Sequence, residues 1–256
     1  LKRQQKEHGI GSIEDFRKNV KKANDKFSSD DLSQKLKNNI KSKLLNDKVT
    51  SFDDLPESLK ENFLVGLEKS DILTKKILNS VYKDVSYSYN PNHSSSSAMP
   101  LLNVVFLKNE DPSTIAHELY HIIDYKYNVT SGNLLKLKLD NDYLRLLELS
   151  NNDLKKYIKN SFLNAFTFEK NSFKMKEEYR GISDILNGLS QGQLYFGYGH
   201  SKKYWKSKPN LYVIEAWAQF GRIGYDGNEN VIEMFVELFP EFSNEVVRIS
   251  KRLGEK

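Results

Sequence analysis

The chain has 256 residues, of which 38% are hydrophobic and 29% are charged, values ordinary for a globular protein though on the polar side. It contains no Cys, which excludes disulfides and thiolate ligands, so any metal site must be built from His, Asp and Glu. No apolar run approaches the roughly 18 residues of a membrane-spanning helix, so we expect no contact with a membrane.

The net charge of +5 is concentrated at the N-terminus. Residues 1–50 contain 13 Lys and Arg against 7 Asp and Glu, whereas the other 206 residues contain 26 against 27. A basic arm of this kind can bind nucleic acid or another acidic partner. Because acidic residues interrupt the arm and no aromatic stacking pattern accompanies it, we favour a solvated helical face and expect no nucleic-acid partner.

The first residues are polar and include neither an initiator Met nor the apolar stretch of a signal peptide. We interpret the chain as part of a longer polypeptide. The expected location is the cytoplasm or a virion.

Residues 1–84 predict a basic helical N-terminal region. Ser12 and Asp15 have the spacing of a helix cap, and Ser51–Pro56 marks a second helix start. The residues after it that recur at roughly helical spacing are Leu59, Phe63, Leu67 and Ile72. Nothing in this region has catalytic spacing, so we expect it to pack or tether.

Two strands are predicted after this region. Residues 85–89 alternate in polarity, and residues 101–107 are apolar and β-branched. The segment between them, 90–99, is rich in Ser and predicts a loop in which His93 is solvated. The second strand leads into a helix that begins near Asp111, and an edge strand beside that helix could pair with an extended peptide.

Asp111 and Pro112 predict the start of this helix, since Asp is a good N-cap and Pro suits the first helical position. Inside the helix, His117-Glu118-Leu119-Tyr120-His121 puts two imidazoles one turn apart on one face. Imidazoles at this spacing can hold a zinc ion, with Glu118 beside it to polarise water. Residues 114–123 are otherwise uncharged and predict burial on nearly every side. The alternative is a core helix whose histidines merely hydrogen-bond.

Asp124 shares the face of the two histidines, because it follows them by three and seven residues. We favour a role in orienting a ligand imidazole through its second ring nitrogen. A hydrogen bond to a backbone donor, or direct ligation of metal, are the alternatives.

Residues 133–180 show amphipathic helical patterns. The apolar stripes, expected to contact the core or a partner, contain Leu134, Leu137, Leu144, Leu147, Leu154 and Ile158. Residues 182–205 are rich in Gly, Ser and aromatic residues, which suits a loop over a site. A tight turn packed by aromatic side chains is the alternative.

Glu215 is the one carboxylate in the apolar, helix-compatible run 211–220. Burying that charge is costly unless a cation is near. A zinc ion held by two neutral histidines requires a third protein ligand and leaves one position for water. We therefore predict Glu215 as the third ligand, with Glu148, His200 and Asp124 as its competitors.

The sequence from Thr114 to Ile123 resembles the extended signature of zincin metallopeptidases. Position 124 is not Gly and position 127 is not His, so the metzincin pattern is absent. The motif His-Glu-x-x-His-x-x-Asp, followed much later in the chain by Glu-Ala-x-Ala-x-x-Phe, is similar to the motifs of gluzincins of the lethal-factor and Pro-Pro endopeptidase type. This resemblance implies zinc bound by His117, His121 and Glu215, with Glu118 as the general base.

In the enzymes of that type, a Tyr seven residues before the third ligand faces the substrate. Lys208 stands at that position here, so Tyr204, Tyr212 or His200 are the alternatives for this role. A second resemblance covers residues 3–12 and the Gly-Tyr-Gly-His-Ser-x-x-Tyr-Trp segment at 197–205. Both are similar to C-terminal regions of phage minor head (head morphogenesis) proteins, which often carry an enzymatic tail.

We therefore expect an α+β fold: a mostly helical, zincin-like metallopeptidase domain at 85–256, with a small sheet beside the active-site helix. The expected function is zinc-dependent endopeptidase hydrolysis of a polypeptide substrate, with a phage head or a larger parent polypeptide as a candidate partner. One alternative is a phage head structural protein that uses zinc only to hold its fold. Another is a nucleic-acid-binding module that uses the basic arm.

Overall fold

The computed structural model describes residues 48–170 and 172–255, and contacts divide the chain into Leu1–Lys48 and Val49–Lys256. The second unit contains every described residue except Lys48. The helix cap expected at Ser12 and nearly all of the basic arm lie outside the described residues.

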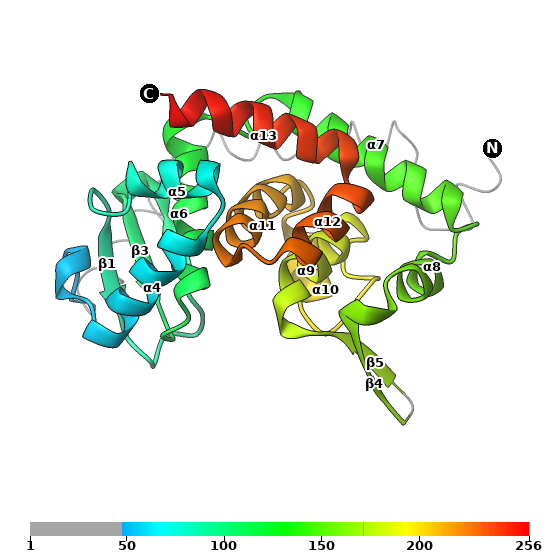
Figure 1. Ribbon diagram of the computed structural model, residues 1–256, viewed down its shortest axis with the longest axis horizontal. Coiled ribbons are helices and arrows are strands. Elements are labelled where there is room, and N and C mark those ends of the chain that lie inside the picture. Colours follow the sequence, from blue (N-terminus) through cyan, green and yellow to red (C-terminus); the bar gives the residue numbers. More distant parts are fainter. Residues whose placement is uncertain (1–47, 171, 256) are drawn as a thin grey trace. The chain divides into compact units, whose positions relative to one another are not determined.

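The second unit is mostly helical and contains a small mixed sheet, which agrees with the expected α+β class. Its helices, coloured along the chain in Figure 1, are α4 (Glu57–Lys69), α5 (Ile72–Asn79), α6 (Pro112–Tyr127), α7 (Asn133–Leu149), α8 (Leu154–Ser161), α9 (Arg180–Leu189), α10 (Lys202–Ser207), α11 (Tyr212–Asp226), α12 (Glu229–Leu238) and α13 (Pro240–Gly254). Short 3-10 turns lie at Phe52–Asp54, Pro100–Leu102, Leu163–Ala165 and Glu177–Tyr179. Within the described ranges, no helix combines the length and the apolar composition that a bilayer crossing requires.

The sheet contains β1 (Ser86–Tyr89), β2 (Ser97–Met99) and β3 (Val104–Leu107) in the order β1-β3-β2. β1 is parallel to the central strand β3, whereas β2 is antiparallel to it and forms one edge. All four residues of β3 are buried, as its apolar sequence predicts. β2 lies in the segment expected to be a loop, so that prediction was too simple. The second strand also begins later than expected, because Pro100–Leu102 forms a 3-10 turn.

Helix α6 is the predicted long, buried helix. The side chain of Asp111 accepts a hydrogen bond from the backbone N–H of Ser113 at 3.1 Å, and Asn128, with φ 51°, caps the C-terminal end of the helix. Eleven of its 16 residues are buried. It packs on β2 and β3, and therefore lies beside the sheet. The predicted cap and burial of this helix are confirmed.

Helix α11 contacts α6 most extensively and α9 next (Figure 1). Gly221 allows the close approach to α6, because a Cβ there would lie 2.2 Å from ring carbons of Tyr120. The indole N–H of Trp217 also donates to the backbone carbonyl of Tyr120 at 3.0 Å. At Tyr120, α6 and α11 are therefore held close together by a residue without a side chain and by a hydrogen bond.

The boundary between the two units lies at Lys48, not at residue 84 as expected. Helix α4 packs against α6 and α11, and the Tyr225 hydroxyl donates to the carbonyl of Phe63 at 2.9 Å. Leu59, Phe63 and Leu67 are buried as their spacing predicts. Ile72 instead begins α5 and is 72% exposed, because the chain turns before it.

Leu154 and Ile158 in the region 133–180 are buried in the core as expected, whereas two other features differ from a helical stripe that contacts the core. Leu134, Leu137 and Leu144 are exposed, because α7 turns its other face, with Leu135, Leu139 and Leu146, toward the core. The second difference is a hairpin of β4 (Phe166–Glu169) and β5 (Ser172–Met175), where only helices were predicted. Farther on, residues 182–189 belong to α9, so the loop expected from 182 begins only after Leu189.

Candidate metal centre

Two turns of α6 present the imidazoles of His117 and His121 to the same point. Their Nε2 atoms lie 3.2 Å apart, and the two rings are perpendicular. Both side chains are largely buried, with 10% and 15% of their side-chain surface exposed. The helical spacing of four residues therefore has the consequence that the sequence predicts: two nitrogen donors converge on one point.

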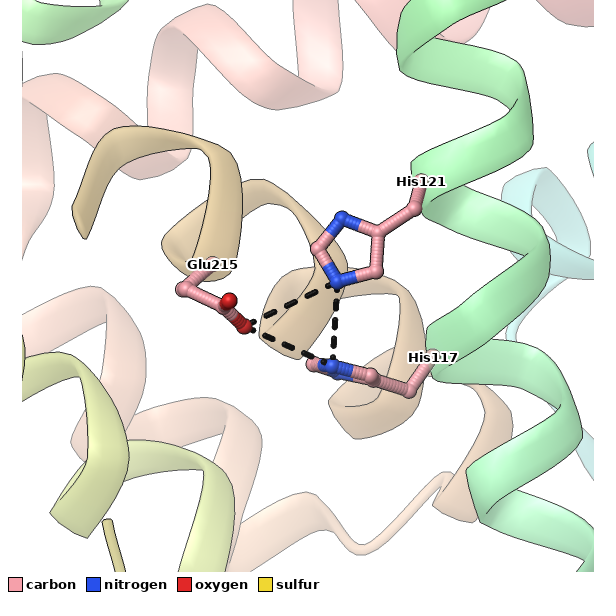
Figure 2. Close-up of side chains that lie close together, drawn as sticks. All are labelled: His117, His121 and Glu215. Atoms are coloured by element: carbon pink, nitrogen blue, oxygen red, sulfur yellow. Dashed lines mark hydrogen bonds and ion pairs between the residues drawn. The ribbon is translucent and has the colours of Figure 1, made fainter. Parts of the chain in front are cut away.

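Glu215 in the first turn of α11 completes the group. Its Oε2 atom lies 3.6 Å from Nε2 of His117 and 3.6 Å from Nε2 of His121. Figure 2 shows the three side chains pointing toward one another from two helices. Their donor atoms form a compact triangle that could hold a metal ion.

The size of this triangle can be compared with zinc geometry. The point equidistant from the three donor atoms lies about 2.0 Å from each, close to the length of zinc–nitrogen and zinc–oxygen bonds. Three donors leave a tetrahedral ion one further position. The donor set and its dimensions therefore fit a zinc ion without rearrangement of the backbone.

Burial and charge act differently on the three candidate ligands. Burial lowers the pKa of His117 to about 3, so this imidazole is neutral and ready to ligate. Burial also disfavours the charged form of His121, but its contact with Glu215 and the charges of Glu118 and Asp124 together outweigh burial and raise its pKa to about 9. Burial alone would raise the pKa of Glu215, but the three neighbouring histidines hold it well below its usual range. Without metal, His121 and Glu215 thus form an ion pair.

Glu118 lies beside the two histidines on α6 and is buried. Burial raises the pKa of its carboxyl group to about 7, while the charge of His121 and a hydrogen bond from the backbone N–H of Ala98 oppose this effect. Ala98 belongs to β2, the edge strand of the sheet. The carboxylate is therefore held between the candidate metal position and the sheet edge.

Comparison with known proteins adds no family to this geometry. The chain matches no family model, and no curated protein or solved structure is significantly similar to it. What the site can do therefore depends on its donor atoms and their surroundings.

The other oxygen of Glu215 has its own partners. The Tyr204 hydroxyl donates to Oε1 at 2.8 Å, and Nε2 of His200 lies 3.5 Å from the same atom. The rings of His200 and Tyr204 stack with centroids 4.0 Å apart. Two of the three residues expected to face a substrate therefore adjoin the metal position.

Tyr212, the third of those residues, lies elsewhere. Its hydroxyl donates to Asp140 of α7 at 2.5 Å, so it faces away from the three ligands even though it begins α11. Glu148, a competitor for the third ligand, is exposed on α7 and does not belong to the ligand group. Tyr212 and Glu148 are excluded because their side chains project from helix faces that do not point toward His117 and His121.

Asp124 hydrogen-bonds locally. Its Oδ1 accepts from the backbone N–H of Thr130 at 2.7 Å, and its Oδ2 accepts from the Thr130 hydroxyl at 2.8 Å. This is the backbone-donor alternative, and Asp124 acts on His121 only through its charge, which raises the pKa of that imidazole. In the part of the chain that the structure describes, Nδ1 of His117 is buried and has no hydrogen-bond partner.

Sequence reasoning missed a set of hydrogen-bonded polar side chains on α11 and α9 near the candidate ligands. Gln219 and Arg222 follow Glu215 by four and seven residues and share its face of α11. The side-chain amide N–H of Gln219 donates to Oδ2 of Asp184 at 2.7 Å, and Arg222 donates to the side-chain oxygen Oε1 of Gln219 at 3.1 Å. Asp184 lies among apolar residues of α9, so the pattern that identified Glu215 would also have identified it.

Proposed function

We propose that the chain is a zinc-dependent metallopeptidase of the zincin kind that hydrolyses internal bonds of a polypeptide. The observation that carries this proposal is the convergence of His117, His121 and Glu215 beside the buried carboxylate of Glu118. Imidazole and carboxylate donors in a three-ligand set with an open position are typical of catalytic zinc. A structural zinc site would use four protein ligands, and three converge here among the described residues.

When bound, a zinc ion would supply a Lewis acid that lowers the pKa of water and polarises a carbonyl group. The chain supplies the proton transfers. Glu118 accepts a proton at its carboxylate and later returns it to the leaving amine. Its pKa of about 7 in the metal-free protein suits transfer in both directions near neutral pH.

Tyr204 and His200 are the candidate donors for the oxyanion that develops on the scissile carbonyl. Both contact Oε1 of Glu215, whereas its Oε2 contacts His117 and His121. The Tyr204 hydroxyl must leave Glu215 to reach a substrate. His200, with 39% of its side chain exposed, is accessible without such a movement.

The edge strand β2 supports a polypeptide substrate. An extended peptide can add to a free sheet edge through backbone hydrogen bonds. The N–H of Ala98 already points to Glu118, so this edge borders the general base. A peptide that pairs along β2 would then run past the catalytic carboxylate.

The test is Glu118→Gln, which keeps the shape of the side chain and removes its basicity. The variant is expected to bind zinc like the parent chain and to lose at least about 100-fold in turnover of an unstructured polypeptide. New peptide termini, detected by mass spectrometry, report cleavage. Glu148→Gln, a matched change at an exposed position of α7, should keep full activity.

Two results would contradict the proposal. One is cleavage by Glu118→Gln at the parent rate. The other is a parent chain that takes up no zinc.

A further inference from the structure

A second group of potential metal ligands shares Glu215 with the first group. The donor atoms of Asp184, His200 and Glu215 all lie within 4.8 Å of one another. The two oxygens of Glu215 divide between the groups, because Oε2 faces His117 and His121 while Oε1 faces His200. Glu215 is therefore a carboxylate with a donor group on each side.

Asp184 is built into this position. Its side chain is 6% exposed, and its Oδ2 accepts the hydrogen bond from Gln219. Arg222 donates to the side-chain oxygen Oε1 of Gln219, which orients the side-chain N–H of Gln219 toward Asp184. This leaves Oδ1 of Asp184 buried without a hydrogen-bond partner among the described residues. An unsatisfied buried carboxylate oxygen is costly unless a ligand uses it.

We propose that Asp184, His200 and Oε1 of Glu215 form a second divalent-cation site, which shares the carboxylate of Glu215 with the first. Carboxylate and imidazole donors suit zinc, manganese and related ions. The half-exposed ring of His200 offers a path from solvent. A carboxylate oxygen has lone pairs for more than one partner, so the hydrogen bond from Tyr204 does not exclude an ion.

The second site must be weaker than the first. Glu118, Glu215 and Asp184 provide three negative charges, and Arg222 acts electrostatically on Glu118 and Asp184. A first divalent ion balances the remaining two negative charges, so a second ion enters without net electrostatic attraction. We expect its affinity to be at least about tenfold lower. If the proposed function is right, an ion held by His200 would also remove a candidate oxyanion donor and lower turnover at high metal concentration.

The experiment is a calorimetric titration of the metal-free chain with Zn²⁺, repeated with Co²⁺ so that absorption spectra report each environment. The parent chain should show one tight event and one weaker event. Asp184→Asn, nearly identical in shape, should lose only the weaker event. His200→Ala should do the same, and its half-exposed position keeps the result interpretable if the Asp184 variant does not fold. Glu148→Gln should retain both events.

Two outcomes would overturn the second site. One is a single event in the parent chain, and the other is a weak event that survives both substitutions, which would place it at surface carboxylates. These outcomes leave the first site and the proposed hydrolysis intact. No binding at all would reject both sites together.

Discussion

The two helices that carry the candidate ligands, α6 and α11, position them in different ways. On α6, the four-residue spacing of His117 and His121 brings the two nitrogens together through helix geometry alone. On α11, Glu215 reaches them only because the helix packs closely on α6, through Gly221 against Tyr120 and the hydrogen bond of Trp217. One half of the site is therefore local, and the other half depends on tertiary packing.

This difference has a consequence for variants. Changes to ligands should remove metal without unfolding the chain. Changes to the α6–α11 contact should reduce stability and metal affinity together, because they displace Glu215 from a pair of histidines that stays in place.

The largest effect is expected from the ligands themselves. His121→Ala removes one of three donors and should weaken zinc binding by more than about 100-fold, beyond the loss that follows removal of an outer partner. Glu215→Ala should release metal in the same way. Circular dichroism should show unchanged helix content, and competition with a chelator measures the affinity. Full zinc content in Glu215→Ala would reject it as a ligand.

The helix contact is tested by Gly221→Ala. The new methyl group would lie 2.2 Å from ring carbons of Tyr120, so α11 must shift. We expect a loss of about 1–3 kcal/mol in the free energy of unfolding, together with weaker zinc binding. Gly132→Ala is the matched control, since no atom lies within 4 Å of its Cβ. Equal stability of the two variants would mean that the close approach is unimportant.

Asp124→Ala separates a structural role from support of a ligand. It removes two hydrogen bonds to Thr130, and we expect a loss of about 1–3 kcal/mol in the free energy of unfolding. Zinc affinity should fall by less than the roughly 10–100-fold that loss of an orienting partner typically causes. Denaturant unfolding and chelator competition measure the two quantities. A 100-fold loss of affinity would restore the role in orienting an imidazole.

The last effect is the release of protons when zinc binds, and no substitution is needed to measure it. At pH 7 the imidazole of His121, with a pKa of about 9, carries a proton that metal must displace, whereas His117 is already neutral. Zinc binding should therefore release about one proton from His121, and affinity should rise about tenfold for each pH unit as the pH increases toward 9. Calorimetry in buffers of different ionisation enthalpy counts the protons. Affinity that does not change with pH would contradict the ion pair of His121 with Glu215.

The same contrast explains which features were predictable from the sequence. The cap at Asp111, the buried face of α6 and the pair of histidines all depend on residues within one helix. Glu215 was identified because a single carboxylate in an apolar run needs a partner. Asp184 obeys the same rule but was overlooked. The strand β2 was missed because Ser97–Met99 is short and follows a Ser-rich segment, and only its pairing with β3 makes it a strand.

The direction in which a side chain points was harder to predict from the sequence than the helix that contains it. Tyr212 and Tyr204 were equal candidates, yet one hydroxyl bonds Asp140 and the other bonds Glu215. On α7 the expected stripe included Leu134, Leu137 and Leu144, which are exposed, since leucines occur on both faces of this helix and the buried face contains Leu135, Leu139 and Leu146. The partner of a side chain and the buried face of a helix depend on the neighbouring elements, which the periodicity of the sequence does not specify.

X-ray absorption spectroscopy of the chain loaded with one equivalent of zinc tests the central claim most directly. It should show two imidazole nitrogens and oxygen donors at about 2.0–2.2 Å, and one imidazole fewer in His117→Ala. A zinc spectrum without imidazole scattering, or one that His117→Ala leaves unchanged, would contradict the assignment of this site.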